Sequence, residues 1–266
     1  MLRFGPDDAS VVVVAPPLFE EANRTRAVIV ALLRGLAERG IAGLLPDLPG
    51  QGESLVATSD ARLAPMREAF AAAVAAAGRG MPVHVATIRS GALLASTGPA
   101  ASRWSWSPQD GTGLLRELTR IKAREGGAEG RPATLATGRL LANQPGDTRA
   151  PSSLGMAPVD KRGANRSAGP NARPDRSRDD GDPAVPVSVA GNLLAPGFLA
   201  DLAEAVMDAP ARVPTRVVRL DGDPRPADRH LPGAPPWRRA EPGSDPALAA
   251  MLADDIADWI SSCAGC

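Results

Sequence analysis

The sequence predicts an α/β fold in which a mostly parallel sheet is covered by helices on both faces. The first observation is that short apolar runs suited to strands alternate with helical stretches along most of the chain. The second is the continuous apolar character of the first such run, which is typical of a strand buried on both sides. The third is the length of 266 residues, which suits one large domain of this type.

The N-terminal part of the chain predicts one β-α-β unit. A strand is expected at 10–15, because a β-branched run that ends at two prolines suits a buried parallel strand. Asn23 or Thr25 is expected to cap a helix that runs to about Arg39. A second strand follows at 41–45, so the helix connects two neighbouring parallel strands.

The same alternation continues through the rest of the chain. The last helix has the clearest signals, because Ser244 or Asp245 can cap it and Pro246 suits its first position. Its apolar stripe, which should pack on the sheet, consists of Leu248, Leu252, Ile256, Trp259 and Ile260. The other expected elements are helices at 62–77, 90–96 and 198–207 and strands at 83–88, 103–107, 185–190 and 216–220.

Residues 143–184 differ in composition from the rest of the chain. They are rich in Pro, Gly, Ser, Asn, Arg and Asp, and a segment of this kind cannot bury enough apolar surface to offset its ordering entropy. We therefore expect a disordered polar insert at 143–184, at the cap position of the domain. The α/β core is expected to comprise residues 1–142 and 185–262, and residues 263–266 to form a tail.

The composition disfavours several classes of partner. Lys plus Arg and Asp plus Glu number 30 each, so no global field attracts nucleic acid or anionic lipid. The longest apolar runs fall short of the roughly 20 residues that cross a bilayer, so no integral membrane segment is expected. The N-terminus lacks the pattern of a secretory signal and the chain has only two cysteines, which together predict a cytoplasmic protein.

The two cysteines, Cys263 and Cys266, form a C-x-x-C motif at the C-terminal end. A zinc site would need four ligands, and the only histidines, His84 and His230, are not at the spacing of a zinc finger. A redox-active C-x-x-C normally begins a helix beside a strand, where the helix N-terminus lowers the thiol pKa. We therefore expect an unstructured tail, no metal site and no cofactor.

A glycine-containing loop, Asp-Leu-Pro-Gly-Gln-Gly-Glu-Ser at 47–54, directly follows the second predicted strand. Its glycines permit a tight turn at the carboxyl end of the sheet, where open α/β folds gather their sites. This D-x-x-G-x-G-x-S pattern resembles the loop that α/β-hydrolases carry there, and a purely structural turn is the alternative. It is not a phosphate-binding loop, because the G-x-x-x-x-G-K-S/T pattern is absent.

An α/β-hydrolase should carry its nucleophile on a G-x-S-x-G turn after the strand predicted at 83–88. Aligning the second glycine of this motif with Gly91 places Thr87 at the first glycine and Arg89 at the nucleophile. A guanidinium stays protonated at any relevant pH and cannot attack a carbonyl. Ser90 follows by one residue, and its backbone N–H rather than its hydroxyl is expected to face the site. The Ser-His-Asp triad is therefore not intact.

The other triad members have only partial candidates. The acid would be expected just after the strand at 185–190, but residues 191–196 contain no carboxylate. His230 lies in the loop expected after the last strand and is a candidate catalytic base, with a solvated loop histidine as the alternative. His84 lies inside a predicted strand, which favours a structural role in the core.

Four stretches of the sequence together resemble one protein family. They are Pro-Pro-Leu-Phe-Glu-Glu-Ala-Asn-Arg-Thr-Arg at 16–26, the loop at 47–54, Ile-Arg-Ser-Gly-Ala-Leu-Leu-Ala at 88–95 and Pro-Pro-Trp-Arg-Arg-Ala-Glu-Pro at 235–242. The chain is similar to the exosortase A system-associated hydrolases of the second type, which are encoded beside bacterial exopolysaccharide and protein-sorting genes. In that family an arginine likewise occupies the nucleophile position of the G-x-S-x-G turn, which is called the nucleophile elbow.

The resemblance has implications for substrate, partners and site. It implies a small-molecule or glycan-linked substrate and partners among the proteins of exopolysaccharide and exosortase systems. Carboxylates and guanidiniums at one sheet edge could form a salt-bridged site for a polar or anionic ligand, with a capped, solvated helix start as the alternative. We expect Arg89 to lie within reach of Glu20 or Glu21. The ligand-binding residues that the resemblance implies are Glu20, Glu21, Asn23, Arg26 and Asp47.

Two functional hypotheses follow from the sequence. In the first, the protein is a hydrolase or acyltransferase that acts on an ester or glycan-linked substrate with a noncanonical site. The candidate catalytic residues are then Arg89, Ser90 and His230. In the second, it is a catalytically degenerate accessory protein that kept the fold and binds a polar or anionic ligand. A serine-reactive fluorophosphonate probe distinguishes them.

Overall fold

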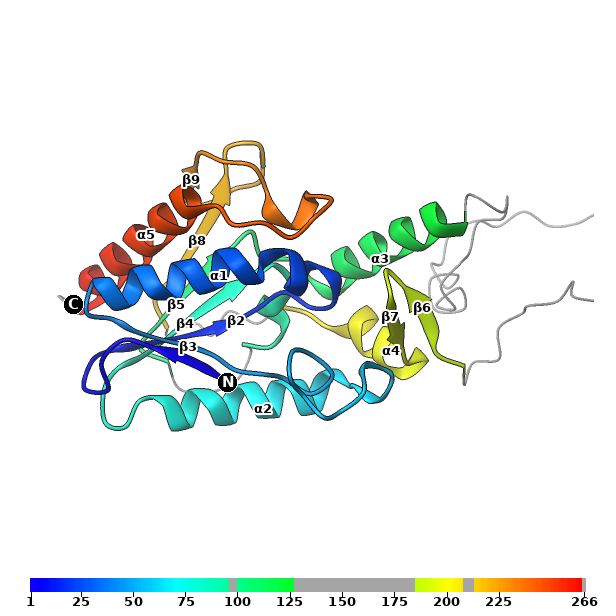
Figure 1. Cartoon of the computed structure of the whole chain (residues 1–266), viewed down its shortest axis with the longest axis horizontal. Coiled ribbons are helices and arrows are strands. Elements are labelled where there is room, and N and C mark those ends of the chain that lie inside the picture. The colour runs from blue at the N-terminus through cyan, green and yellow to red at the C-terminus, as the bar shows by residue number, and fades with distance from the viewer. Residues whose placement is uncertain (96–99, 127–184, 208–212, 265–266) are drawn as a thin grey trace, which may run out of the picture.

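A computed structural model of the chain describes residues 1–95, 100–126, 185–207 and 213–264. Its centre is a seven-stranded sheet with the strand order β1-β3-β2-β4-β5-β8-β9, in which β1 alone is antiparallel to its neighbour (Figure 1). The expected α/β architecture with a mostly parallel sheet is confirmed. The strands are Leu2–Phe4 (β1), Val11–Ala15 (β2), Ala42–Leu45 (β3), Val83–Ile88 (β4), Ser102–Trp106 (β5), Thr215–Leu220 (β8) and Arg229–Leu231 (β9).

Strand β2 forms the centre of the sheet because every one of its side chains is apolar and buried. It pairs in parallel with β3 on one side and with β4 on the other, and Ala15 lies opposite Thr87 where these strands end. Parallel strands need long crossover connections, which the helices supply. The carboxyl ends of β2, β4 and β5 therefore meet at one edge of the sheet.

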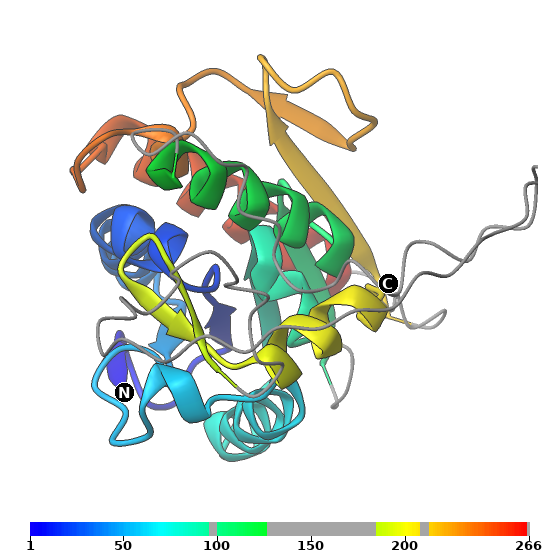
Figure 2. The same ribbon diagram turned by 90° about the vertical axis from the view of Figure 1, so that its right-hand side faces the viewer.

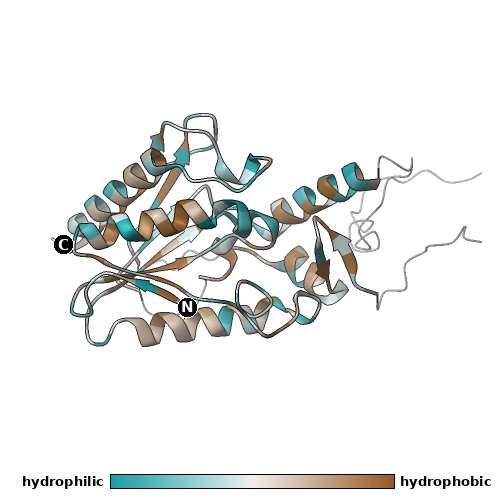
Figure 3. Ribbon diagram, viewed as in Figure 1, coloured by the Kyte–Doolittle hydropathy of each residue, from teal (hydrophilic) through white to brown (hydrophobic). Residues whose placement is uncertain are grey.

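Helices cover both faces of the sheet and bury their apolar sides against it (Figures 1 and 3). Helices α1 (Glu20–Glu38) and α5 (Pro246–Ala264) pack on one face together, with Leu32 and Leu252 fully buried between them and the sheet. The opposite face carries α2 (Leu63–Ala77), α3 (Gly111–Gly126) and α4 (Pro196–Glu204).

A two-stranded hairpin stands apart from the central sheet (Figure 2). It consists of β6 (Val187–Val189) and β7 (Asn192–Leu194), which pair antiparallel across a two-residue turn. Both turn residues have positive φ, at 49° for Ala190 and 74° for Gly191, as a tight hairpin turn requires. The expectation that 185–190 is a strand of the main sheet is therefore wrong.

Several helix boundaries differ from those expected. Helix α1 begins at Glu20, so Asn23 and Thr25 lie inside it and neither caps it. The chain turns at Phe19, and the first-turn acids Glu20 and Glu21 suit the positive end of the helix dipole. The helix expected at 90–96 is a short 3₁₀ turn, η2 (Arg89–Leu93), within the described residues.

The predicted insert and the predicted C-terminal tail are only partly covered by the described residues. The insert predicted at 143–184 lies outside the described residues. Helix α5 continues through Cys263 to Ala264, so these two residues are helical, and residues 265–266 lie outside the described residues. Within the described residues, no helix is both long enough and apolar enough to span a membrane.

Candidate functional site

Unusual backbone conformations gather at the carboxyl edge of the sheet. Phe19 follows β2 with φ of 61°, Arg89 follows β4 with φ of 54°, and Ser107 follows β5 with φ of 47°. A positive φ costs a non-glycine residue about 1–3 kcal/mol and persists where surrounding structure enforces it. Strain of this kind is enriched at ligand-binding and catalytic sites, which marks this edge as the candidate site.

Arg89 occupies the sharp turn where β4 passes into η2. The turn packs so closely against β2 that a Cβ atom at Gly91 would lie 2.2 Å from the carbonyl oxygen of Ala15. Only glycine fits there without moving the backbone. The strained turn therefore holds the Arg89 side chain at the edge of the sheet, although the side chain itself is buried.

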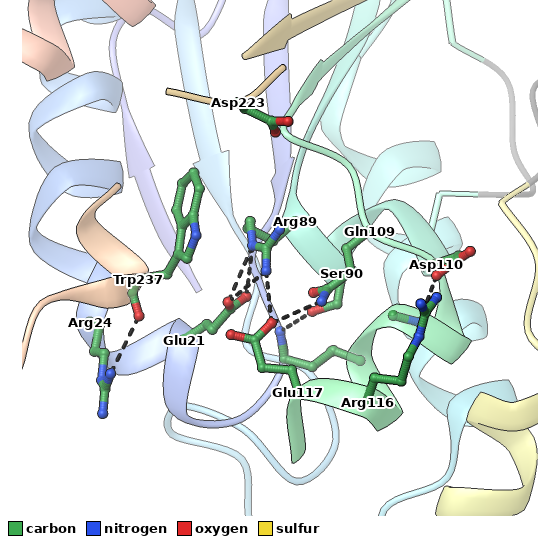
Figure 4. A network of polar contacts seen from close by, with 12 residues as sticks. Glu21, Arg24, Arg89, Ser90, Gln109, Asp110, Arg116, Glu117, Asp223 and Trp237 are labelled. Atoms are coloured by element: carbon green, nitrogen blue, oxygen red, sulfur yellow. Dashed lines mark hydrogen bonds and ion pairs between the residues drawn. The ribbon is translucent and has the colours of Figure 1, made fainter. Parts of the chain in front are cut away.

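Two carboxylates share the Arg89 guanidinium (Figure 4). Its Nε donates to both carboxylate oxygens of Glu21 at 3.2 Å, and its Nη2 donates to Glu21 Oε1 at 3.0 Å. The same Nη2 donates to Glu117 Oε2 at 2.9 Å. Glu117 comes from α3, and Gln109 Nε2 also donates to its Oε2 at 2.9 Å. The site thus joins α1, η2 and α3.

An indole packs against the same guanidinium. The Arg89 carbon Cζ lies 4.9 Å from the ring centroid of Trp237, which belongs to the 3₁₀ turn η3 (Pro236–Arg238). Trp237 in turn meets Trp106 edge to face with 5.0 Å between centroids. This cation–π contact reinforces the ion pair in a partly desolvated setting.

The Glu21 carboxyl group is strongly perturbed by this environment. Burial raises its pKa to about 7, while the charge and hydrogen bonds of Arg89 oppose the rise and Glu117 adds to it. A group with this pKa changes its protonation near neutral pH. The floor of the site is therefore able to take up or release a proton.

Arg89 and Glu117 line an open cleft of about 600 Å³, a size that suits a small-molecule ligand. Its charged lining is dominated by arginine, with six guanidiniums and three carboxylates. The guanidiniums are those of Arg89, Arg116, Arg120, Arg219, Arg225 and Arg238, and the carboxylates those of Asp110, Glu117 and Asp223.

Two polar atoms in the cleft wall lack hydrogen-bond partners. The Ser107 hydroxyl and the Gln109 Oε1 atom are both buried, and neither has a partner among the described residues. A buried polar group without a partner costs about 1–3 kcal/mol. A bound water or ligand that reached these atoms would remove this cost.

Comparison with known proteins identifies the fold. No protein-family model matches the chain, and no curated protein sequence matches it. Among solved structures, Est1E from Butyrivibrio proteoclasticus with bound ferulic acid aligns over 96% of this chain and 91% of its own, with a TM-score of 0.52 and 12% identity. Alpha/beta hydrolase domain-containing protein 10 from mouse aligns over 98% and 93%, with a TM-score of 0.54 and 13% identity. The chain has an α/β-hydrolase fold.

In an α/β-hydrolase fold the acid follows the nucleophile in chain order. We expected it after 185–190, but that segment is in the hairpin, and the strand beside β5 is β8. Asp223 follows β8 and binds Arg225 at 2.6 Å and Arg219 at 3.0 Å. Hydrogen bonds from the Arg225 side chain, the Arg225 backbone N–H and the Arg219 side chain hold the pKa of Asp223 well below its usual range. Burial of the carboxyl group opposes this shift. This carboxylate holds two arginines rather than a histidine.

The structure also places the candidate nucleophile and base. Ser90 is fully buried, and its hydroxyl accepts a hydrogen bond from the Leu18 N–H at 2.9 Å. This hydrogen bond engages the Leu18 N–H, which belongs to the loop between β2 and α1. His230 lies within β9 instead of the expected loop, is exposed, and contacts the Asp223 carbonyl at 3.1 Å. It does not line the cleft.

The remaining predicted ligand-binding residues lie outside this cleft. Asn23, Arg26 and Asp47 line a separate cavity of about 40 Å³ near the start of α1. Asp47 accepts a hydrogen bond from the Met1 amino group, which is the largest cause of the lowered pKa of its carboxyl group. Glu20 pairs with Arg24 along α1 at 3.0 Å.

Sequence reasoning did not identify four of the residues that build the cleft. Glu117 was missed with the whole of α3, although Leu114 and Leu118 have helical spacing and Asp110 can cap the helix start, as its Oδ1 does at 2.7 Å. Ser107 and Gln109 carry no local motif, and Trp237 lies in the stretch at 235–242 that contributed to the family resemblance but was not assigned to the site. His84 is buried and bonds Ser102 at 2.8 Å, as a structural histidine should. In the described part of the chain, no three metal-ligating side chains come together.

Proposed function

We propose that this protein binds a small anionic ligand in its arginine-lined cleft and does not act as a serine hydrolase. The observation that carries the proposal is the elbow itself. The residue that an α/β-hydrolase would use as nucleophile is Arg89, which lies at the floor of the cleft in a buried ion pair with Glu21. A guanidinium cannot attack a carbonyl, but it binds carboxylate and phosphate groups well.

The charge of the cleft supports an anionic ligand. Its lining has three more guanidiniums than carboxylates. Arg116, Arg120 and Arg238 have no carboxylate partner among the described residues, and all three are exposed at the cleft. Arg116 and Arg120 lie one turn apart on α3 and present their charges on the same side as Glu117. A cleft of this charge concentrates anions.

The neutral lining supports a ligand with additional polar groups. The unpartnered Ser107 hydroxyl can donate a hydrogen bond to an oxyanion. The side-chain oxygen Oε1 of Gln109 can accept one from a ligand hydroxyl. The strained backbone at Ser107 is consistent with a residue that is held in place for binding. These features fit a small acid that also carries a hydroxyl or amide.

Calorimetric titration with sulfate and with succinate tests the proposal. At low ionic strength we expect both probes to bind, and the double variant Arg116→Ala, Arg120→Ala to bind at least about tenfold more weakly. Arg124→Ala is the matched control, because Arg124 lies on the same helix but does not line the cleft. Failure of both probes to bind at millimolar concentration contradicts the proposal.

The biological setting that we propose comes from the resemblance of four sequence stretches to exosortase-associated hydrolases. On this basis the ligand is a small-molecule or glycan-linked compound of a bacterial exopolysaccharide or protein-sorting system. The order of genes around the coding sequence tests this setting. Exopolysaccharide or exosortase genes beside it would support the assignment, and their absence across several genomes would contradict it.

A second candidate function is hydrolysis of an ester by the noncanonical site. The observation that favours it is the pKa of Glu21, raised to about 7 beside Glu117, which suits general acid–base catalysis. Short-chain nitrophenyl esters test it. Turnover that Glu21→Gln abolishes and the control Glu20→Gln retains would support catalysis, and turnover equal to the buffer rate would exclude it for these esters.

A further inference from the structure

We infer that anion binding at Arg89 is coupled to proton uptake by the carboxyl pair Glu21 and Glu117, so that the cleft takes an oxyanion together with a proton. This inference rests on the proposed anion binding and adds a role for the two glutamates. They determine under which conditions the floor of the cleft accepts negative charge.

The geometry leaves one part of Arg89 available to a ligand. Its Nε and Nη2 atoms hold Glu21 and Glu117, whereas its Nη1 atom makes no hydrogen bond to any described residue. Arg89 lines the cleft, so Nη1 is the donor that an entering oxyanion can reach. Glu117 is the more accessible of the two carboxylates, with 29% of its side chain exposed against 10% for Glu21.

Charge balance explains why a proton should follow the anion. One guanidinium already faces two carboxylates, and an oxyanion on Nη1 adds a third negative group to a largely buried cluster. Arg89 from η2 and Glu117 from α3 are the charged groups with the largest effect on Glu21. The loop before α3 contributes the neutral amide of Gln109, and η3 contributes the neutral indole of Trp237. Protonating one carboxyl group relieves the excess negative charge.

The direction of the linkage follows from the sign of the added charge. In the free protein burial raises the pKa of Glu21 to about 7, and a bound anion raises it further. Binding therefore takes up protons at and above neutral pH. Affinity should rise as pH falls from about 9 to 6, by about tenfold for each pKa unit of the added shift, and then level off.

Calorimetry with sulfate measures this coupling directly, because sulfate stays dianionic throughout that pH range. The binding enthalpy is compared in two buffers of different ionisation enthalpy at pH 7.5, and affinity is measured from pH 6 to 9. We expect uptake of a fraction of one proton for each sulfate bound. Uptake of zero with a flat affinity profile would overturn the inference while leaving anion binding intact.

Variants test whether the carboxyl pair takes up the proton. Glu21→Gln resembles the protonated state, so it should bind sulfate at pH 8.5 as tightly as the unchanged protein does at pH 6, without proton uptake. Glu20→Gln is the matched control, because Glu20 pairs with Arg24 away from Arg89, and it should keep the full pH dependence.

Two further outcomes complete the test. If Glu21→Gln does not fold, Glu117→Gln removes the other carboxylate and is expected to abolish uptake equally. Retention of uptake in both glutamine variants would overturn the inference. No sulfate binding at any pH would overturn both the inference and the proposed function.

Discussion

At the scale of single residues, Arg89 places a fixed positive charge at the strained turn after β4. The guanidinium satisfies Glu21 and Glu117 and stacks on Trp237, and its side chain is only 8% exposed. A charge buried in this way is stabilised by its partners, so the partners depend on it in turn. The Arg89 side chain is therefore part of the structural support of the cleft.

Arg89→Ala should destabilise the fold by about 3–5 kcal/mol at pH 8, where Glu21 is ionised, because it leaves a buried carboxylate without its cation. Denaturant unfolding measures the change. Arg89→Lys should recover little of it, since an ammonium cannot reproduce the two-point contact with Glu21. In the double variant with Glu21→Gln the total cost should fall short of the sum by about 1–3 kcal/mol. Additive costs would show that the pair is not coupled.

The raised pKa of Glu21 predicts a pH dependence of stability. The folded protein holds the proton up to about pH 7, while the unfolded chain releases it near the ordinary value of 4.5. Between these values the folded state binds more protons, so stability falls as pH rises, by up to roughly 3 kcal/mol from this group. Unfolding experiments across pH 4.5–8 should show this decline, and Glu21→Gln should lack its share. An unchanged profile in that variant would contradict the assignment.

The sequence allowed part of this site to be placed. Arg89 and Glu21 were expected together because each follows a parallel strand at its carboxyl end, and they do pair. The predicted companions Asn23 and Arg26 line the smaller cavity instead. Helix α1 begins at Glu20, and its helical periodicity places Glu21, but not these two residues, beside Arg89. Glu117 reaches the site only through the tertiary packing of α3, which no local pattern specifies.

At the scale of elements, a buried carboxylate adds polar contacts to the apolar packing of α5 on the sheet. Asp255 is fully buried and accepts hydrogen bonds from the Trp104 indole and from Arg229, both at 2.7 Å. Its neighbour Asp254 faces solvent and pairs with Arg39, which directly follows α1. The two adjacent aspartates thus differ in environment while sharing a helix, which makes them a matched pair for measurement.

Asp255→Ala should lower the free energy of unfolding by about 3–5 kcal/mol, because it leaves two guanidiniums and an indole N–H without their acceptor. Asp254→Ala should cost no more than about 1 kcal/mol, as is usual for an exposed ion pair. Thermal or denaturant unfolding compares them. Equal costs for the two variants would show that the buried network contributes little.

The elements themselves were predictable where their signals were local. Strand β4, helix α2 and the start of α5 lie within one residue of their expected bounds. The β6–β7 hairpin was misassigned because an isolated run of valines cannot indicate which sheet it joins. Strands β1 and β9 have three residues each, too few to give a periodic pattern.

At the scale of the whole molecule, the formal net charge is zero, but positive charge exceeds negative charge in the lining of the cleft. Arginines concentrate at one edge of the sheet, where the cleft opens beside α3, and the strained residues Arg89 and Ser107 lie at the same edge. The arginine-lined cleft thus lies at the carboxyl edge of the sheet, and the anion binding that we propose there depends on its side chains rather than on the fold.

This arrangement predicts that a fluorophosphonate probe will not label the protein. Residue 89 is an arginine and has no hydroxyl. The hydroxyl of the next residue, Ser90, is buried and accepts a hydrogen bond from the Leu18 N–H. Gel fluorescence or intact mass spectrometry, with a serine hydrolase as positive control, measures labelling. Stoichiometric labelling that Ser90→Ala abolishes would restore the hydrolase assignment.

The contact between Arg89 and Trp237 also gives the cleft an optical signal. Indole emission responds to nearby charge, and this ring lies 4.9 Å from a guanidinium that an anion is expected to engage. A sulfate titration should therefore change the intrinsic fluorescence, and Trp237→Phe should remove the change while the remaining tryptophans still emit. Occupancy of the cleft can then be followed in solution, without a labelled ligand or knowledge of the natural one.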